Sequence, residues 1–389
     1  MPEHLNLRSN ALNPLNRFLG WGMVALGFVW AAGLDPWALG TSGAEGVQRL
    51  ALRQAHGVLL GMGFLQLLVA RLNRRQSEGP TAACWLTAIG AVTYSTGHVV
   101  RLHYPSLGWL IPVGALFNVA GFGWLLRVYL HAGAGLAVRL ALTAVVFGMV
   151  LDAGMGLCSM RPELLATYLG PEDGVRLRML RLARVASIAL PIQAILYDRL
   201  RQHAPALRVV RWGGGALAWG AIGMPAVLTA AALGNLGLKY LLPLPADAVL
   251  FGAGVAVWLA FRSSSLPARW GWSLLLASMG VGQLMGGYAF DGPLPAPPAF
   301  TGYLDFARSL ARIGHAYAIL LGLLALFAAD LEPGPLRRVG LNMLAIGTAF
   351  TLTAMALVAA GLLPGAWLAP GPAVVALAVL ILARGKVPE

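Results

Sequence analysis

Apolar runs of roughly 20 residues, separated by short segments that hold charge, Pro or Gly, follow one another from residue 16 to residue 384. A helix of about this length crosses the hydrocarbon core of a bilayer. The pattern predicts twelve transmembrane helices, of which the eighth and twelfth are the shortest, at residues 16–34, 50–71, 82–101, 108–131, 138–157, 177–197, 213–235, 246–262, 271–290, 310–329, 339–363 and 368–384. We therefore expect an all-α integral membrane protein, with a tail at residues 1–15 and one transmembrane domain at residues 16–389.

Composition supports this fold class. The chain is 58% hydrophobic and 11% charged, with a mean hydropathy of +0.72, whereas a soluble domain holds about 25% charged residues. The net charge of +13 does not indicate a nucleic-acid partner, because the basic residues are spread between the apolar runs. The lipid bilayer is the expected surrounding.

The basic residues also predict an orientation. If the N-terminus is cytoplasmic, the cytoplasmic segments hold 17 of the 28 Lys and Arg residues, as the positive-inside rule requires. We therefore expect both termini in the cytoplasm of a bacterial cell, with the chain in the inner membrane. Four arginines on the predicted outer side do not follow this rule: Arg176, Arg178, Arg181 and Arg184. Binding of an anionic ligand would explain their position.

Three predicted helices, spaced four apart, begin with an Arg in a turn rich in Leu and Ala. The stretches that carry this Arg lie at residues 52–61, 182–187 and 310–317. This spacing divides the membrane portion into three four-helix units, at residues 16–131, 138–262 and 271–384. The shared Arg at this regular spacing indicates an internal repeat, with three copies of one inner helix.

Two of these inner helices carry a histidine three residues after the Arg. An ionisable side chain at such depth usually faces the bundle interior, and imidazole is an axial ligand of haem iron. A glycine adjoins each histidine and would let a flat macrocycle approach the backbone. The Arg side chains, one turn outward, would pair with haem propionates. The predicted cofactor-binding residues are His56, His315, Arg53, Arg312, Gly57 and Gly314, with Arg184 and Arg181 as further propionate partners.

One haem b held by both histidines would be low-spin and would transfer electrons. The alternative is that Arg53 and Arg312 extend to the interface while the histidines hydrogen-bond between helices. His98 and His103 remain available for a second haem or as interfacial residues. His4, His131 and His203 are expected to be solvated or structural. Met155, Cys158 and Met160 are soft ligands that could bind copper. The alternative is that the methionines fill gaps in the core.

The residues His56-Gly57-Val58-Leu59-Leu60 resemble the second-helix motif of the haem–copper oxidase catalytic subunit, whose histidine ligates the low-spin haem. His315-Ala316-Tyr317 resembles the tenth-helix segment that completes the same haem. The resemblance implies twelve helices in three arcs of four over residues 16–384, with cytoplasmic termini.

Departures from that family concern its oxygen-reducing centre. Ile313 stands where the tenth-helix histidine for the high-spin haem is expected, and predicted helices six and seven hold no histidine for copper. The resemblance therefore implies an electron-transfer subunit without copper, passing electrons between a periplasmic redox partner, such as a cytochrome c, and a quinone or second cofactor, within a membrane complex.

Two alternatives remain. A weaker resemblance to the NnrS family, on the His-bearing second helix, implies a haem and copper protein of nitric oxide stress. The other alternative is a transporter without a cofactor, in which the histidines and Asp152 line a pathway. Catalysis is not expected, because Gly213-Gly214-Gly215 lacks the context of a phosphate loop and Ser263-Ser264-Ser265 has no His or Asp partner nearby.

Overall fold

The computed structural model describes residues 14–40, 46–73, 81–101, 104–159, 169, 174–202, 207–263, 265–300 and 306–385. This part of the chain folds into long helices and contains no β strand. The long helices are α1 (Pro14–Gly40), α2 (Gly46–Asn73), α3 (Thr81–Val100), α4 (Leu110–His131), α5 (Leu136–Ser159), α7 (Val175–Gln202), α8 (Arg208–Leu233), α9 (Pro243–Ser263), α10 (Leu266–Tyr288), α11 (Phe306–Ala329), α12 (Pro335–Ala359) and α13 (Pro370–Ala383). Each of the twelve predicted apolar ranges coincides with one of these helices, within a few residues at either end.

Ten of these helices, some with a neighbouring 3-10 turn, are long and apolar enough to cross a membrane. The expected short helices, α9 and α13, are among the ten. The helices α3 and α10 are not among the ten. The protein is an all-helical, multi-pass membrane protein.

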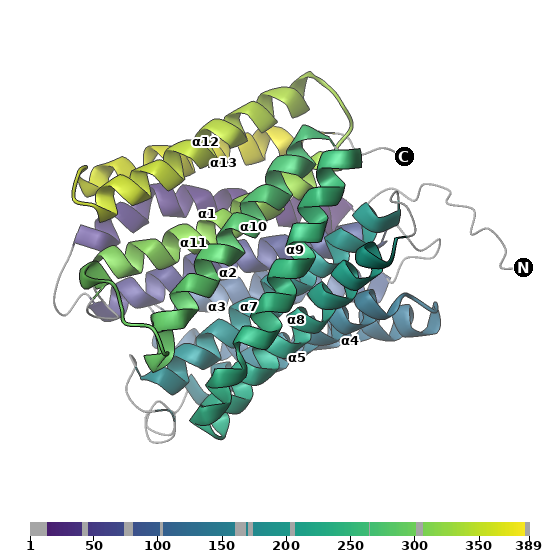
Figure 1. Ribbon diagram of the computed structural model, residues 1–389, viewed down its shortest axis with the longest axis horizontal. Coiled ribbons are helices and arrows are strands. Elements are labelled where there is room, and N and C mark those ends of the chain that lie inside the picture. Colours follow the sequence, from purple (N-terminus) through teal and green to yellow (C-terminus); the bar gives the residue numbers. More distant parts are fainter. Residues whose placement is uncertain are drawn as a thin grey trace, which may run out of the picture.

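Three helices occupy the centre of the bundle. Burial covers 83% of the apolar window of α2, 67% of that of α7 and 61% of that of α11, against 50% or less in the other seven. In Figure 1, α2 and α7 run through the middle, with α12 and α13 along one edge and α4 and α5 along the other. These central helices are the three that share the Arg in a Leu- and Ala-rich segment near their N-terminal ends.

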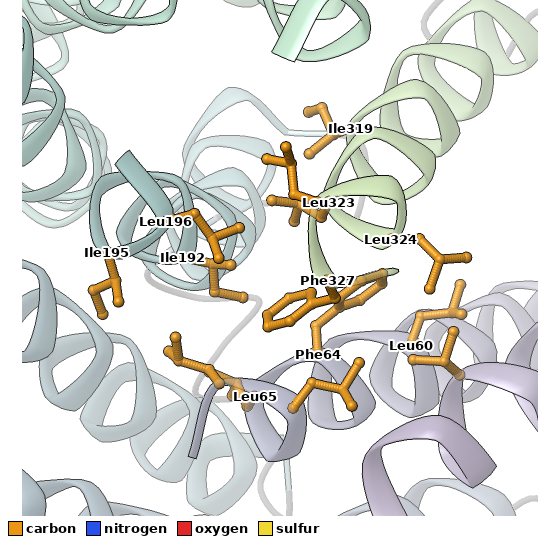
Figure 2. Close-up of a cluster of buried hydrophobic side chains, with 14 of the residues drawn as sticks. Leu60, Phe64, Leu65, Ile192, Ile195, Leu196, Ile319, Leu323, Leu324 and Phe327 are labelled. Atoms are coloured by element: carbon orange, nitrogen blue, oxygen red, sulfur yellow. The ribbon is translucent and has the colours of Figure 1, made fainter. Parts of the chain in front are cut away.

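The second halves of the three central helices pack against one another mainly through apolar side chains, and the buried Gln193 of α7 lies among these positions in the sequence. Figure 2 shows this cluster, which we call the seal: Leu60, Phe64 and Leu65 of α2, Ile192, Ile195 and Leu196 of α7, and Ile319, Leu323, Leu324 and Phe327 of α11. The rings of Phe64 and Phe327 lie 6.1 Å apart between centroids. Because protein interiors pack as densely as organic crystals, this half of the bundle centre leaves no path for a polar solute.

An ionic cluster closes the same end of the bundle. Asp330, one residue beyond α11, forms ion pairs with Arg71 in the last turn of α2 and with Arg199 in the last turn of α7. One carboxylate thus joins the C-terminal ends of all three central helices. We call this end the Asp330 end, and the opposite end, where α2, α7 and α11 begin, the histidine end.

Candidate functional site: a polar vestibule at the histidine end

His56 lies on α2 and is buried, with 7% of its surface exposed. Its Nε2 atom lies 3.3 Å from the hydroxyl of Tyr317 on α11, and the two rings are 6.0 Å apart. The ring of Tyr317 also packs edge-on against Phe28 of α1, at 5.8 Å between centroids. The side chain that faces His56 across the α2–α11 contact is therefore a tyrosine.

His315 faces a different helix. Its Nδ1 atom lies 2.9 Å from the backbone oxygen of Ser278 and 3.1 Å from that residue's hydroxyl, both on α10. Gly282, one turn further along α10, makes room for the ring: a methyl group there would lie 2.6 Å from Cε1 of His315. Residues 315 and 317 are two apart on a helix, which turns them about 200° from each other, so only one of them can face α2.

In the structure, His56 and His315 contact different helices. Bis-histidine ligation needs two imidazoles on opposite sides of one iron, whereas here one ring contacts α11 and the other contacts α10. The expected pair is thus not brought together. The shared Arg-x-x-His spacing fixes how deep each histidine lies in its helix, but it does not fix which neighbour the side chain faces.

The other predicted haem contacts are also dispersed. The side chain of Arg53 lies outside the described residues, as does His103. Arg312 donates to the hydroxyl of Ser309 at 3.0 Å. A methyl group at Gly314 would meet the sulfur of Met355 on α12 at 3.7 Å, so this glycine faces a neighbouring helix. Gly57 alone borders open space, with no atom within 4 Å of a Cβ added there.

A spectroscopic prediction follows from the placement of the two histidines. Protein purified in detergent and supplied with haem is expected to lack a reduced-minus-oxidised signal of a low-spin, bis-histidine haem b. The control is the pair of variants His56→Ala and His315→Ala, which should leave the spectrum of the preparation unchanged. A sharp low-spin signal that both substitutions abolish would contradict the side-chain placement described above.

The first halves of the central helices do not pack tightly. On each helix, the face that forms the seal also includes residues one or two turns closer to the histidine end. We call this face the inward stripe. In the first halves its residues are exposed or half-buried: Gly57 and Gly61 on α2, Val185 and Ile188 on α7, and Arg312 and Ala316 on α11. Val185 is 57% exposed, while Ile192, seven residues later on the same stripe, is 0% exposed. The inward stripes are therefore less completely buried here than in the seal, although a methyl group at Gly61 would still lie 3.9 Å from Cδ1 of Ile188. We call the part of the bundle centre lined by these six residues the vestibule.

The vestibule carries positive charge. Arg312 lies on its α11 side, and Arg181 lies one turn before Val185 on α7, half-buried. Arg184 lies on the neighbouring stripe of α7 and keeps 20% of its side chain exposed. A concave space lined by one sign of charge attracts ions of the opposite sign, so this arrangement favours an anion.

Arg184 belongs to a polar cluster that joins three helices. Its guanidinium forms an ion pair with Asp152 of α5, whose side chain is only 3% exposed. It also donates to the hydroxyl of Tyr94 on α3 at 2.9 Å. The Tyr94 hydroxyl in turn lies in reach of the Asp152 carboxylate, so that it accepts from the Arg and donates to the Asp. Ionisable groups inside a membrane bundle are rare and mark functional positions by default.

His98 completes the cluster. It lies one turn after Tyr94 on α3, is 5% exposed, and packs edge-on against the Tyr94 ring at 4.8 Å between centroids. Neither of its ring nitrogens has a hydrogen-bond partner within the part of the chain that the structure describes. Buried polar groups in native proteins are nearly always satisfied, so an imidazole in this state indicates a position that a ligand or water occupies.

Close packing of α3 against α4 fixes the position of Tyr94. Gly114 of α4 lies directly against it: a methyl group there would come within 2.3 Å of the Tyr94 backbone nitrogen. Since nothing but hydrogen fits at this contact, the helices approach closely and the Tyr94 side chain is directed toward α5 and α7.

Sequence reasoning named Asp152, Arg184 and His98 separately but did not join them, and it missed Tyr94. The spacing of Tyr94 and His98, four residues apart on one helix face, was an available signal. Comparison of the chain with protein-family models and with curated proteins gives no match, so the geometry of the site carries the functional conclusion.

Proposed function

We propose that this protein is a membrane transporter, and that the structure corresponds to its state open at the histidine end. The observation that carries this proposal is the contrast along the three central helices. Their inward stripes are exposed or half-buried in the first halves, where Arg312 lies, and are buried and apolar in the second halves. Alternating access requires a site that is open to one side of the membrane and closed to the other. Groups of helices rock around this fixed site and so expose it to each side in turn.

The proposal includes twelve membrane spans. The helices α3 and α10 have 20 and 23 residues, long enough to cross with the other ten. Several polar residues of these two helices face protein: Thr87 is 0% exposed, His98 is 5% exposed and Ser278 is 3% exposed. With the termini in the cytoplasm, as the distribution of Lys and Arg favours, the vestibule opens outward and Asp330 lies at the inner surface of a bacterial inner membrane.

The transporter accounts for the buried groups better than the electron-transfer subunit does. Electron transfer through one haem needs the paired imidazoles that His56 and His315 do not provide, whereas a transporter needs ionisable groups beside an accessible space. Arg184, Asp152 and His98 meet that requirement. No observation favours the copper chemistry of the NnrS-like alternative.

A test of transport that needs no known solute measures whether the seal opens. Leu323, which is 1% exposed in the seal, is replaced by Cys in a background where the exposed Cys158 is Ser. The thiolate is the reacting species, so a maleimide labels only water-accessible positions. A transporter passes through an inward-open state, and slow labelling of Leu323→Cys from the Asp330 side is therefore expected.

The control for that experiment is the Cys158→Ser background, which retains only the buried Cys84 and should stay unlabelled. A rigid carrier of electrons has no reason to open its core. Leu323→Cys that stays unlabelled at every temperature below unfolding would overturn the proposed transport cycle.

A further inference from the structure

We infer that the cluster of Tyr94, His98, Asp152 and Arg184 binds a small monocarboxylate anion together with one proton. This inference rests on the proposed transporter function and names its substrate class.

Arg184 is the group that would bind the anion. A guanidinium presents a planar fork of donors that matches a carboxylate in two parallel hydrogen bonds. At present the fork is directed at the carboxylate of Asp152, while 20% of the side chain remains exposed. An incoming carboxylate that takes the place of Asp152 has the same shape and charge as the group that it replaces, and it reaches Arg184 by the exposed side.

Asp152 is the group that would take the proton. Its side chain is 3% exposed, so without Arg184 its negative charge would be left in a poorly solvated position. If the ligand carboxylate and Asp152 were both charged, Arg184 would face two negative charges. In a poorly solvated position this excess charge costs much more free energy than it would at the protein surface. Protonation of Asp152 restores the balance, because Arg184 then pairs with the ligand and the neutral carboxyl can still hydrogen-bond to the Tyr94 hydroxyl. Anion and proton therefore bind together.

Among the described residues, no other carboxylate lies near Asp152 that could take up the proton in its place. α3 contributes Tyr94, His98 and, after its last turn, the half-buried Arg101. α7 contributes Arg184 and, one turn earlier, Arg181. α4 and α8, which also pack on α5, carry their charged or titratable side chains at the opposite end: Arg127, Tyr129 and His131 on α4, and Arg208 and Arg211 on α8. The charge on Asp152 is thus set against cations alone.

His98 provides the hydrogen bond that an anion would need beyond Arg184. Both of its nitrogens are buried and lack partners in the described residues, and leaving such a group unsatisfied is unfavourable. A carboxylate held by Arg184, on the side of the Tyr94 ring where His98 lies, would accept from a ring N–H. The vestibule cations Arg181 and Arg312 would raise the local concentration of the anion before it binds.

The experiment measures binding of pyruvate, a monocarboxylate, to the purified full chain in detergent. Titration calorimetry at pH 6, 7 and 8, in buffers of different ionisation enthalpy, gives both Kd and the number of protons taken up. We expect one proton for each pyruvate bound, and a Kd that weakens about tenfold for each pH unit, as linkage to one proton requires. In Asp152→Asn, which mimics the protonated acid, pyruvate should bind without proton uptake and with no dependence on pH.

The double variant Asp152→Asn/Arg184→Gln keeps the cluster uncharged and should bind no pyruvate. Arg176→Gln is the matched control, since Arg176 lies on the same helix but caps the end of α8 through the oxygens of Ala232 and Gly234. It should bind pyruvate as the wild type does.

Three results would overturn the inference: no binding of pyruvate by the wild type, binding without proton uptake, or binding that persists in the double variant. None of them bears on the labelling of Leu323→Cys. If Leu323→Cys is labelled while pyruvate binding fails, the transporter stands and its substrate class is wrong. If Leu323→Cys is never labelled, the transport cycle fails whether or not pyruvate binds.

Discussion

Replacing Arg184 by Gln is expected to lower the free energy of unfolding by about 3–5 kcal/mol at pH 7, because the change leaves the Asp152 charge buried without a cation. The carboxylate is 3% exposed and so cannot recover the loss by hydration. Chemical unfolding of the detergent-solubilised protein measures the effect. Asp152→Asn should cost less, since Arg184 remains 20% exposed and keeps its bond to the Tyr94 hydroxyl.

A double-mutant cycle gives the sharper result. The variant that carries both Arg184→Gln and Asp152→Asn is expected to be more stable than Arg184→Gln alone, because two neutral amides can hydrogen-bond to each other and cost less to bury than an unpaired carboxylate. A coupling of about 2 kcal/mol or more would be typical of contacting charges in one network. Strict additivity of the two substitutions would show that the pair is not formed in the folded protein.

Replacing Asp330 by Asn is expected to have the second-largest effect, a loss of about 2–4 kcal/mol in the free energy of unfolding, because Arg71 and Arg199 lose their shared anion. We place it below the effect of Arg184→Gln because Asp330 is 18% exposed and Arg199 is 39% exposed, so solvent screens part of the change. Glu332→Gln is the matched control: it removes the same charge two residues away, and no ion pair of Glu332 is found among the described residues.

The same substitution should also alter access to the seal. With Asp330→Asn the ends of α2, α7 and α11 are no longer joined by one carboxylate, and states open at the Asp330 end become more populated. Labelling of Leu323→Cys from that side should therefore be faster in the Asp330→Asn background. An unchanged labelling rate together with a large loss of stability would show that Asp330 supports the fold without controlling access.

Helix positions could be predicted from the sequence because the bilayer sets the length of each apolar run. The two shortest predicted spans are also helices. Together with their adjoining 3-10 turns they cover residues 236–262 and 365–383, which is long enough to cross a membrane. The shared Arg near the N-terminal ends also singled out α2, α7 and α11, which are the most buried helices. The twelve-span arrangement and the oxidase-like architecture remain proposals.

The site could not be predicted in the same way. His56 and His315 match in depth, but depth along a helix and direction around it are separate quantities, and the Tyr317 ring rather than His315 faces α2. The cluster of Tyr94, Asp152 and Arg184 joins residues 58 and 32 positions apart in the chain. Only the packing of α3, α5 and α7 brings them together, and no local spacing encodes that packing.

The most direct test of the vestibule is the reactivity of Val185→Cys, in the Cys158→Ser background, toward a membrane-impermeant maleimide in vesicles of both orientations. Val185 is 57% exposed on a central helix, and Ile346, the control, is 63% exposed on α12 at the edge of the bundle. A thiol in water forms the reactive thiolate, whereas a thiol facing lipid does not. We predict rapid labelling of Val185→Cys from the histidine end only, and no labelling of Ile346→Cys; a Val185→Cys as inert as Ile346→Cys would show that the central helices enclose no aqueous space.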